Sequence, residues 1–409
     1  MSEPGFCPSR IAILVEDFDM LRRFYVDNYK SLINVTFEPC ETSLFLGINN
    51  AGKTNLCQAM RFLSWTASHN LDDCADAIAG SRYGLTNRYF EKDTVDFRVG
   101  AETDFENERL QFSYDLTITA PPRLDAAPTI QIVRESLKVT GKGFDDICLL
   151  ENIDGRVRLL HESDHLRGTS HCVDTKSPRD TTMLNRLYDL STNPRANLFK
   201  QYLGAWQYYS LSPEALREPL HRPNETLLRV DGGNLSSVLY FLKNTNEREY
   251  RKLIKHVQKL DPSIDLMNFH LASEDSVFMF FEDTEGRMLP ARNASSGTLR
   301  YIAMLYVLTI QASFAKDVLI LFEEPENGIY VGFLRDLLQL VESAKSKPQV
   351  VFTSHSPYFI DLFDDRIESI FLLKRGDKHS MLSKPDVEKV RSRLERFPLG
   401  EQHFREMLG

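Results

Sequence analysis

The feature that most constrains this chain is the segment 47–54, which reads Gly-Ile-Asn-Asn-Ala-Gly-Lys-Thr. The apolar run Ser-Leu-Phe-Leu at 43–46 comes directly before it, and a helix-like pattern at 55–63 follows it. A strand, a glycine-rich turn and a helix in this order direct successive backbone N–H groups at a phosphate chain, and the helix N-terminus adds partial positive charge. The segment therefore predicts a nucleoside triphosphate site. The alternative is an ordinary glycine turn that only begins a helix.

Two side chains of this loop are expected to contact the phosphates of a bound nucleotide or its metal ion. Lys53 is expected to reach the β- and γ-phosphates, and the hydroxyl of Thr54 is expected to be a ligand of Mg²⁺. The remaining residues of the turn present their backbone N–H groups to the phosphates. The predicted nucleotide-binding residues of the loop are Gly47, Asn49, Asn50, Ala51, Gly52, Lys53, Thr54 and Asn55.

A second chemical signal follows an apolar run near the C-terminus. Residues 317–322, Asp-Val-Leu-Ile-Leu-Phe, read as a buried parallel strand, and Glu-Glu-Pro-Glu-Asn-Gly follows at 323–328. Sheets of α/β proteins place catalytic groups at such strand tips. Glu323 is expected to hold Mg²⁺, directly or through water, and Glu324 is expected to polarise the water that attacks the nucleotide. The alternative is an acidic turn with no role beyond ending the strand.

Two further segments have the chemistry of anion binding. The apolar run at 349–353 reads as another buried strand, and His355 behind it can hydrogen-bond a γ-phosphate or the attacking water. Ser295 and Gly297 precede an apolar helix at 301–312, and the N–H groups at a helix start favour an anion. Each segment alone also has a structural explanation, as a histidine in a polar turn or as a capped helix.

The four segments stand in a fixed order, and this order resembles that of the ABC-type ATPase heads. Two more segments narrow the resemblance, namely Asn-Tyr-Lys-Ser-Leu at 28–32 and Asp-Gly-Gly-Asn-Leu at 231–235. With them the chain looks like the OLD-like and RecF-like branch, which is related to SMC heads and is frequent among bacterial anti-phage ATPases. The resemblance covers about residues 22–65 and 230–375.

The resemblance implies ATP as the nucleotide and a head-to-tail homodimer, or a higher homo-oligomer, with two ATP molecules between the heads. Ser295 and Gly297 would then contact the γ-phosphate of the nucleotide held by the opposite protomer, and His355 would sense the γ-phosphate. OLD enzymes carry a Toprim nuclease domain beyond the histidine strand. Only 54 residues follow His355 in this chain of 409, whereas a domain has roughly a hundred. We therefore expect the Toprim domain to be missing.

The expected fold class is α/β, an ABC-type ATPase head with a mixed parallel sheet, an antiparallel β subdomain and a helical insertion. Alternating patterns predict strands within 87–118 and 129–160, with a hairpin turn at 152–155. Helical patterns cover 193–202, 234–242 and 248–260.

Three parts are expected along the chain. The first part of the head would hold the phosphate loop and the β subdomain, a β-rich and helical insertion would offer a partner-binding region, and the last part would hold the Ser-Gly, acidic and histidine segments. Their expected boundaries are 1–118, 119–230 and 231–409.

Composition limits the choice of partners and of compartment. The net charge of −9 argues against a uniformly basic DNA-coating protein. Local basic patches stay possible at 247–259 and 389–396, and the alternative is that these segments are the solvated faces of two helices. No apolar run approaches the roughly 18 residues of a membrane span, and no signal peptide is recognisable. Six scattered cysteines without a CxxC pair indicate reduced thiols. We expect a cytoplasmic protein without a membrane partner.

One motif favours a different chemistry. Residues 161–171 spell a literal HExxHxxGxxH, the pattern with which zinc proteases bind the metal through three histidines and use the Glu as general base. Here His161, His165 and His171 would be the ligands. Because 156–160 reads better as the second strand of a hairpin than as part of a long active-site helix, we interpret the segment as a polar surface loop with clustered histidines.

The sequence thus predicts an ATP-hydrolysing ATPase that works as a nucleotide-switched assembly. We expect it to be the ATPase subunit of a bacterial anti-phage defence system, whose effector, a nuclease or a toxin, is a separate protein. One alternative is a RecF-like DNA-repair ATPase that binds DNA directly, so nucleic acid stays open as a partner. The second alternative is a zinc metallopeptidase with an NTP-binding module. A transporter ATPase is disfavoured, because no glutamine-loop residue is recognisable.

Overall fold

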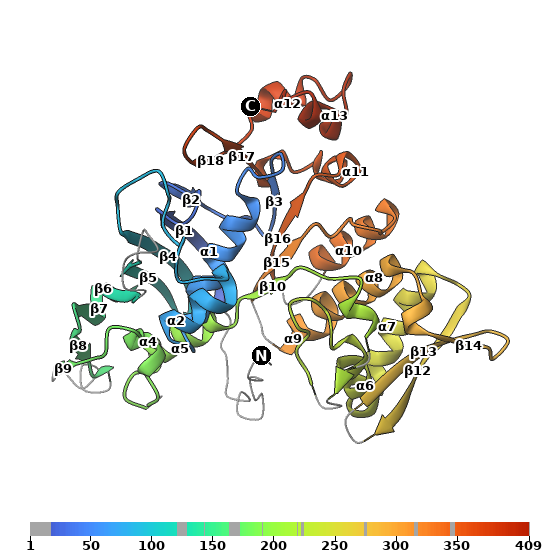
Figure 1. Cartoon of the computed structure of the whole chain (residues 1–409), viewed down its shortest axis with the longest axis horizontal. Coiled ribbons are helices and arrows are strands. Elements are labelled where there is room, and N and C mark those ends of the chain that lie inside the picture. The colour runs from blue at the N-terminus through green and yellow to red at the C-terminus, as the bar shows by residue number, and fades with distance from the viewer. Residues whose placement is uncertain are drawn as a thin grey trace. The chain divides into compact units, whose positions relative to one another are not determined.

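The computed structural model of the protein describes residues 18–120, 129–142, 144–162, 172–189, 191–218, 220–221, 225–273, 276–314, 318–343 and 348–408. The chain divides into two compact units, and Figure 1 labels the elements of both. We call Glu16–Tyr208, Asp317–Leu321 and Gln349–Gly409 the phosphate-loop unit. We call Met1–Val15, Tyr209–Lys316 and Phe322–Pro348 the helical unit. Each unit is described by itself.

A six-stranded sheet positions the phosphate loop. Its central strand β3 (Thr42–Leu46) is parallel to both neighbours, β16 (Gln349–Ser354) and β17 (Ile370–Arg375). Every residue of β3 and β16 is buried, as expected for parallel strands covered on both faces. The strand order is β10-β15-β16-β3-β17-β18, with β10 at Gln207–Tyr209, β15 at Leu319–Glu323 and an antiparallel β18 at Ser380–Ser383.

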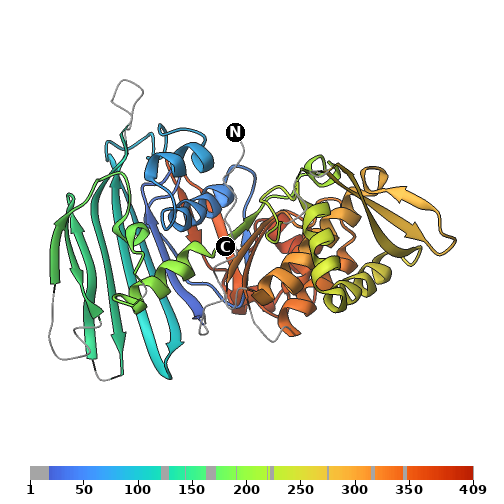
Figure 2. The same ribbon diagram turned by 90° about the horizontal axis from the view of Figure 1, so that it is seen from below.

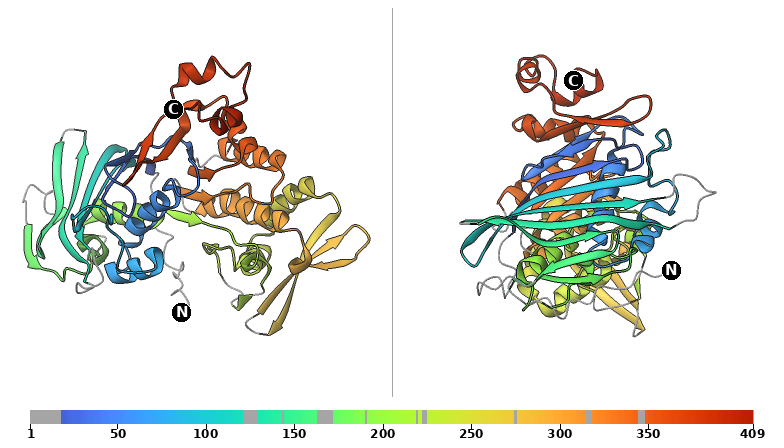
Figure 3. Two further views of the ribbon diagram at one scale, coloured as in Figure 1. Left: turned by 45° about the horizontal axis from the view of Figure 1, so that its top comes forward. Right: turned by 90° about the vertical axis from the view of Figure 1, so that its left-hand side faces the viewer.

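The phosphate-loop unit also contains an eight-stranded antiparallel sheet, in the order β2-β1-β4-β5-β6-β7-β8-β9. Buried residues alternate with less buried ones along β4 and β5, so one face of the sheet is in the core. Phe199 of helix α5 (Pro194–Gly204) packs on that face against Phe112 and Tyr114. In Figure 2, α5 is the green helix that lies beside the strands of this sheet. The strands lie side by side in the right-hand view of Figure 3. Their bounds are Phe18–Asp27, Val35–Phe37, Thr94–Phe105, Glu108–Thr119, Gln131–Gly141, Phe144–Ile153, Arg156–Leu160 and Cys172–Lys176 for β1, β2 and β4 to β9.

Helix α1 (Lys53–Trp65) begins in the phosphate loop and packs against the antiparallel sheet. The ring of Phe62 in α1 stacks on Phe97 of β4 with 5.7 Å between centroids, and Tyr29 contacts both rings. This aromatic cluster is fully buried, so it fixes the direction in which α1 leaves the loop. The smaller helices of the unit are α2 (Leu71–Cys74), α4 (Met183–Arg186), α11 (Pro357–Ile360), α12 (Val387–Arg391) and α13 (Leu399–Phe404).

The helical unit combines helices with a small antiparallel sheet. Strand β13 (Ser276–Asp283) pairs with β11 (Leu220–His221), β12 (Ile264–Ser273) and β14 (Met288–Pro290). Helix α8 (Ser296–Tyr306) continues through a π-helical turn at Val307–Gln311 into α9 (Ala312–Phe314). The other helices are α6 (Leu235–Thr245), α7 (Glu247–Leu260) and α10 (Val331–Ser343).

Most elements lie where the sequence predicted them. The hairpin turn at 152–155 joins β7 and β8, and the three helical patterns correspond to α5, α6 and α7. The predicted strand at 349–353 extends by one residue, to Ser354. The helix expected at 301–312 instead begins at Ser296 and has a π-helical turn in its second half. Among the helices in the described ranges, none is long and apolar enough to span a membrane.

Candidate functional site

The phosphate loop ends in a helix start that is open to an anion. Gly52, the N-cap residue of α1, has φ 105°, a left-handed conformation that favours glycine. No side chain caps this N-terminus, and no acidic residue lies in the first turn. The first N–H groups of a 13-residue helix are therefore available to an acceptor, and the helix dipole favours a negative one.

Lys53 directs its ammonium group at the same loop. The residue is only 6% exposed, and Nζ donates hydrogen bonds to the carbonyl oxygens of Gly47 at 2.7 Å and Ile48 at 3.3 Å. Nδ1 of His355, which follows β16, lies 3.5 Å from Nζ. The structure thus brings together the predicted phosphate lysine and the predicted histidine, although 302 positions separate them in the sequence.

The C-terminal hairpin of β17 and β18 supports this loop, an arrangement that no local motif predicts. A Cβ atom on Gly47 would lie 2.4 Å from the carbonyl oxygen of Leu373, so only glycine allows the loop to lie this close to β17. The hydroxyl of Ser380 in β18 donates to Oγ of Ser31 at 2.8 Å. Asn55 also donates to Ser31 Oγ, at 2.8 Å, and so fixes the first turn of α1.

A second histidine lies within electrostatic reach of the loop. His403 is in α13, which packs on α11, the helix that follows His355. Burial lowers the pKa of His403, and the positive charges of His355 and Lys53 lower it further. The sequence analysis missed this residue, because α13 is short and carries no motif that points to a nucleotide.

In the helical unit, the Ser-Gly helix start lies against the acidic loop. Ser295 caps α8, and its Oγ accepts a hydrogen bond from the N–H of Gly297 at 3.2 Å. A Cβ atom on Gly297 would lie 2.0 Å from the carbonyl oxygen of Gly328. Glycine at 297 is therefore what lets the start of α8 approach the loop at 323–328.

This contact predicts a stability defect. Gly297→Ala should displace the acidic loop or the start of α8, and forcing extra atoms into a packed region costs about 1–3 kcal/mol. Calorimetry should therefore show a lower thermal unfolding midpoint. Gly100→Ala is the matched control, because its Cβ would lie an ordinary 3.7 Å from Cβ of Arg23. A wild-type midpoint for the Gly297 variant would contradict the close approach.

The acidic loop holds Glu324 in an unusual backbone conformation. Glu323 is the last residue of β15, and Glu324 after it has φ 45°, in the left-handed region that a non-glycine residue rarely occupies. Asn327 supports this turn, because its Nδ2 donates to Glu324 Oε2 at 2.8 Å and its backbone N–H donates to Glu324 O at 3.2 Å. The surrounding turn thus fixes the direction of the Glu324 carboxylate.

Arg300 of α8 adds a positive charge beside these carboxylates. One guanidinium nitrogen donates to the carbonyl oxygen of Asn327 at 3.1 Å. Burial lowers the pKa of Arg300, while the charges of Glu214, Glu324 and Glu326 raise it. The charge of the guanidinium therefore attracts the acidic loop to α8, in addition to the packing of Gly297 against Gly328.

The predicted site residues fall in both units. The loop at 47–55 and His355 lie in the phosphate-loop unit. Ser295, Gly297 and the carboxylates Glu323 and Glu324 lie in the helical unit. The boundary runs through β15, whose first three residues belong to the phosphate-loop unit. The two predicted Mg²⁺ ligands, Thr54 and Glu323, thus come from different units.

The HExxHxxGxxH segment contains a glutamate with a structural contact. His165 and His171 lie outside the described residues. Glu162 is buried, and its two carboxylate oxygens accept hydrogen bonds from the N–H groups of Arg195 and Ala196, each at 3.0 Å. These groups belong to the first turn of α5, so the carboxylate that a protease would use as general base binds a helix N-terminus instead. Within the described ranges, no three His, Cys, Asp or Glu side chains are grouped to hold a metal.

Comparison with known proteins agrees with this architecture. Residues 175–361 match the family model described as an AAA domain, putative AbiEii toxin, type IV toxin–antitoxin system. No curated protein matches the sequence. Among solved structures, an SMC head bound to the C-winged helix domain of ScpA is similar, with a TM-score of 0.53 and 12% identity, over 91% of this chain and 99% of that one.

Two other SMC heads have lower TM-scores. The head domain from Thermotoga maritima has a TM-score of 0.43 and 10% identity, over 90% of this chain and 100% of that one. A Pyrococcus furiosus head with an extended coiled coil, bound to the C-terminal domain of ScpA, has a TM-score of 0.47 and 13% identity, over 92% and 98%.

The fold is therefore similar to that of an SMC head. This result confirms the α/β fold class that the sequence predicted. The OLD-like branch and the roles of the individual residues stay predictions.

Proposed function

We propose that the chain binds ATP with Mg²⁺ and hydrolyses it as a homodimer or larger homo-oligomer. One observation carries the proposal: the uncapped N-terminus of α1, the left-handed Gly52 and the buried ammonium of Lys53 converge on one loop. Uncapped N–H groups and a buried cation are the donors that a triphosphate needs. The oxygen ligands Thr54 and Glu323 match the preference of Mg²⁺, which would neutralise charge on the β- and γ-phosphate oxygens when bound.

Each predicted residue receives one role in this proposal. Lys53 binds the phosphates, and Glu324 accepts a hydrogen bond from the attacking water and so orients it. His355, next to Lys53, contacts the γ-phosphate and differs in its contacts between ATP and ADP. Ser295 and Gly297 bind the γ-phosphate of the nucleotide held by the opposite protomer, which makes hydrolysis depend on the dimer.

We further propose that a separate effector, a nuclease or a toxin, acts together with this ATPase in a bacterial anti-phage system. The match of residues 175–361 to a family described by a toxin–antitoxin system supports this context. The effector would contact residues within about 119–224, a segment that lies outside the two stretches whose sequence resembles ATPase heads, about 22–65 and 230–375. ATP binding can control such a partner only through contacts that differ between the two states of the heads.

Purified protein tests the proposal. Alone, the chain should hydrolyse ATP in the presence of Mg²⁺, lose this activity in excess EDTA, and leave plasmid DNA uncut with Mg²⁺ or Mn²⁺. Co-expression with the product of the adjacent gene should give a complex that co-purifies. Absence of ATP binding would refute the ATPase, while metal-dependent DNA cleavage by the isolated chain would refute the separate effector.

A further inference from the structure

Helix α13 brings a second histidine to the phosphate loop. Gly400 of α13 lies so close to α11 that a Cβ atom on it would be 2.3 Å from the carbonyl oxygen of Pro357. His403 is one helical turn after Gly400, so both residues lie on the same face of α13. Pro357 begins α11 directly behind the segment that contains His355. The face of α13 that carries His403 therefore packs on the histidine segment.

Backbone and amide contacts hold α13 in this place. The N–H of Gly400 donates to the carboxylate of Asp361 at 2.8 Å. Gln402 is fully buried, and its Nε2 donates to the carbonyl oxygen of Val390 at 3.2 Å. These contacts come from residues on either side of His403 and not from its ring. A substitution of His403 should therefore leave α13 in place.

Positive charge surrounds the ring of His403. Nζ of Lys53 lies 3.5 Å from Nδ1 of His355, and the charges of both residues act on His403. Burial lowers the pKa of His403, and these two charges lower it further. At neutral pH the imidazole is therefore mostly neutral. Three groups that can carry positive charge thus lie together beside the uncapped N-terminus of α1.

Two carboxylates near His403 are engaged elsewhere. Asp361, in the turn after α11, accepts the N–H of Gly400. Glu401 of α13 pairs with Arg405 at 2.7 Å. The other ionisable groups beside α13 include a phenol and a guanidinium, those of Tyr358 and Arg393. A bound anion can supply the negative charge that stabilises an imidazolium at this place.

We propose that His403 binds the γ-phosphate of ATP beside Lys53 and His355, and that it takes up a proton from the solvent as ATP binds. This inference rests on the proposed function and adds to it a residue that makes the site selective for a triphosphate. ADP lacks the phosphate that His403 would contact, so ADP should stabilise the imidazolium less than ATP does.

The direction of the pH dependence follows from the proton uptake. A complex that binds one proton more than the free protein is favoured as the pH falls, by up to about tenfold in affinity per pH unit. The increase ends below the pKa of His403 in the free protein, which is lower than the ordinary value of 6.5. Below that pH the ring is protonated with or without ATP. Above the pKa of the complex the contribution of His403 is lost.

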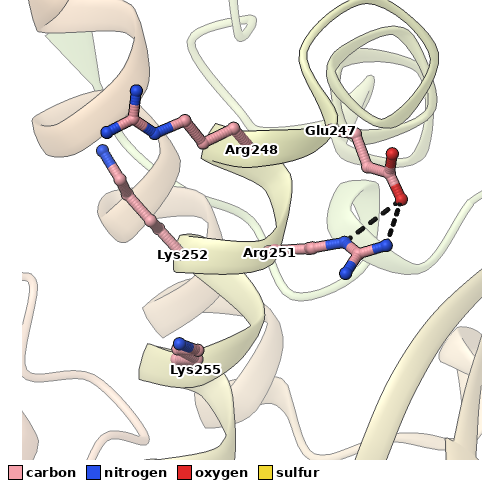
Figure 4. A pocket seen from close by; sticks show the side chains of 5 residues that line it. All are labelled: Glu247, Arg248, Arg251, Lys252 and Lys255. Carbon is pink, nitrogen blue, oxygen red and sulfur yellow. Dashed lines mark hydrogen bonds and ion pairs between the residues drawn. The ribbon is translucent and has the colours of Figure 1, made fainter.

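A second group of cations provides a matched control. A hollow of about 430 Å³ on α7 of the helical unit is lined by Glu247, Arg248, Arg251, Lys252 and Lys255. Figure 4 shows Arg251 directed at Glu247, with which it forms an ion pair at 2.6 Å. Exposed cations attract polyphosphates through charge alone. Lys255→Gln therefore removes one positive charge from a cation group that is in the other unit.

The experiment measures the binding of ATP and of ADP to the full chain by isothermal titration calorimetry, from about pH 6 to about pH 8.5 with Mg²⁺ in excess. Titrations in two buffers with different ionisation enthalpies give the number of protons taken up. His403→Gln keeps a hydrogen-bonding side chain that is uncharged at every pH, and His403→Lys has a permanent positive charge. Circular dichroism establishes that each variant is folded.

We expect the wild-type protein to take up a proton with ATP near neutral pH, and clearly less with ADP. His403→Gln should bind ATP about tenfold more weakly at about pH 6.5, the lower end of the range for a hydrogen bond to a charged group. The variant should also lose the proton uptake and keep its ADP affinity. His403→Lys should restore ATP affinity without proton uptake, which a purely structural histidine would not explain. Lys255→Gln should behave as the wild type.

The outcomes separate this inference from the proposed function. A wild-type protein that does not bind ATP would refute the proposed function and the role of His403 with it. ATP binding whose affinity and proton uptake persist in His403→Gln would refute the role of His403 alone. Equal loss of ATP and ADP binding in both His403 variants would overturn it too, because α13 would then have a structural role. An equal loss in Lys255→Gln would overturn it as a general effect of charge.

Discussion

Glu324→Gln should slow ATP hydrolysis by roughly 10²- to 10⁴-fold, the range typical of a positioned acid–base group. ATP binding should be nearly unchanged, because Glu324 is proposed to act on the attacking water and not on the phosphates. The amide keeps the size of the carboxylate and can keep a hydrogen bond with Asn327, whose Nδ2 lies 2.8 Å from Glu324 Oε2. Since the nucleotide binds but is not cleaved, the ATP-bound dimer should accumulate.

Single-turnover hydrolysis and analytical size-exclusion chromatography with ATP measure the two effects. Glu326→Gln is the matched control, because it removes a carboxylate from the same loop. The charge of this carboxylate acts on Arg300, as the charge of Glu324 does. The control should keep hydrolysis within about tenfold of the wild type if Glu324 is the positioned base. Wild-type turnover in Glu324→Gln would refute the assignment, and an equal loss in both variants would indicate a general effect of charge.

The sequence predicts those parts of the candidate site whose residues follow one another in the chain. The buried β3, the glycines of the turn and the helical segment after them are contiguous, and local chemistry is enough to predict a phosphate loop. The buried strands β15 and β16 are likewise apolar runs with polar residues behind them. The order of these segments resembles that of the ABC-type ATPase heads, and this resemblance implied the fold class.

The unforeseen parts depend on residues that are distant in sequence. The hydroxyl of Ser380 donates a hydrogen bond to Ser31, which is 349 positions away in the sequence. The carbonyl oxygen of Leu373 lies so close to position 47 that only glycine fits there. Such pairs are not recognisable in a single sequence, because neither residue lies within the local pattern of the other. The buried Glu162 illustrates the same point, because a motif suggested a catalytic base where packing places a helix cap.

The conformation of Glu324 contradicts a local rule. A residue before proline is normally extended, since the proline ring disfavours compact backbone conformations at the preceding position. Glu324 precedes Pro325, yet it has φ 45°. Two hydrogen bonds from Asn327 to Glu324 stabilise this turn. The close packing of Gly297 against Gly328 stabilises it further. Strain of this kind concentrates at functional sites, which supports the choice of Glu324 over its neighbours as the residue that orients water.

Lys53→Ala should weaken ATP binding by roughly 10- to 100-fold, because a charge-assisted hydrogen bond to a phosphate contributes about 1.5–3 kcal/mol. Titration with a fluorescent ATP analogue measures the loss. Lys92→Ala is the control, since its side chain is exposed and its Nζ pairs with Asp27 and Asp96 in the same unit. Unchanged affinity in Lys53→Ala would refute the phosphate site.

Combining Lys53→Ala with Glu324→Gln tests whether the two units act on one nucleotide. Lys53 belongs to the phosphate-loop unit and Glu324 to the helical unit, so the proposal requires both units to contribute to the same ATP. If they do, the dimer that Glu324→Gln accumulates needs bound ATP, and the double variant should be monomeric at ATP concentrations that assemble the single variant. A dimer that persists in the double variant would show that Glu324→Gln promotes association without nucleotide, and the proposed coupling of the two units through ATP would then be wrong.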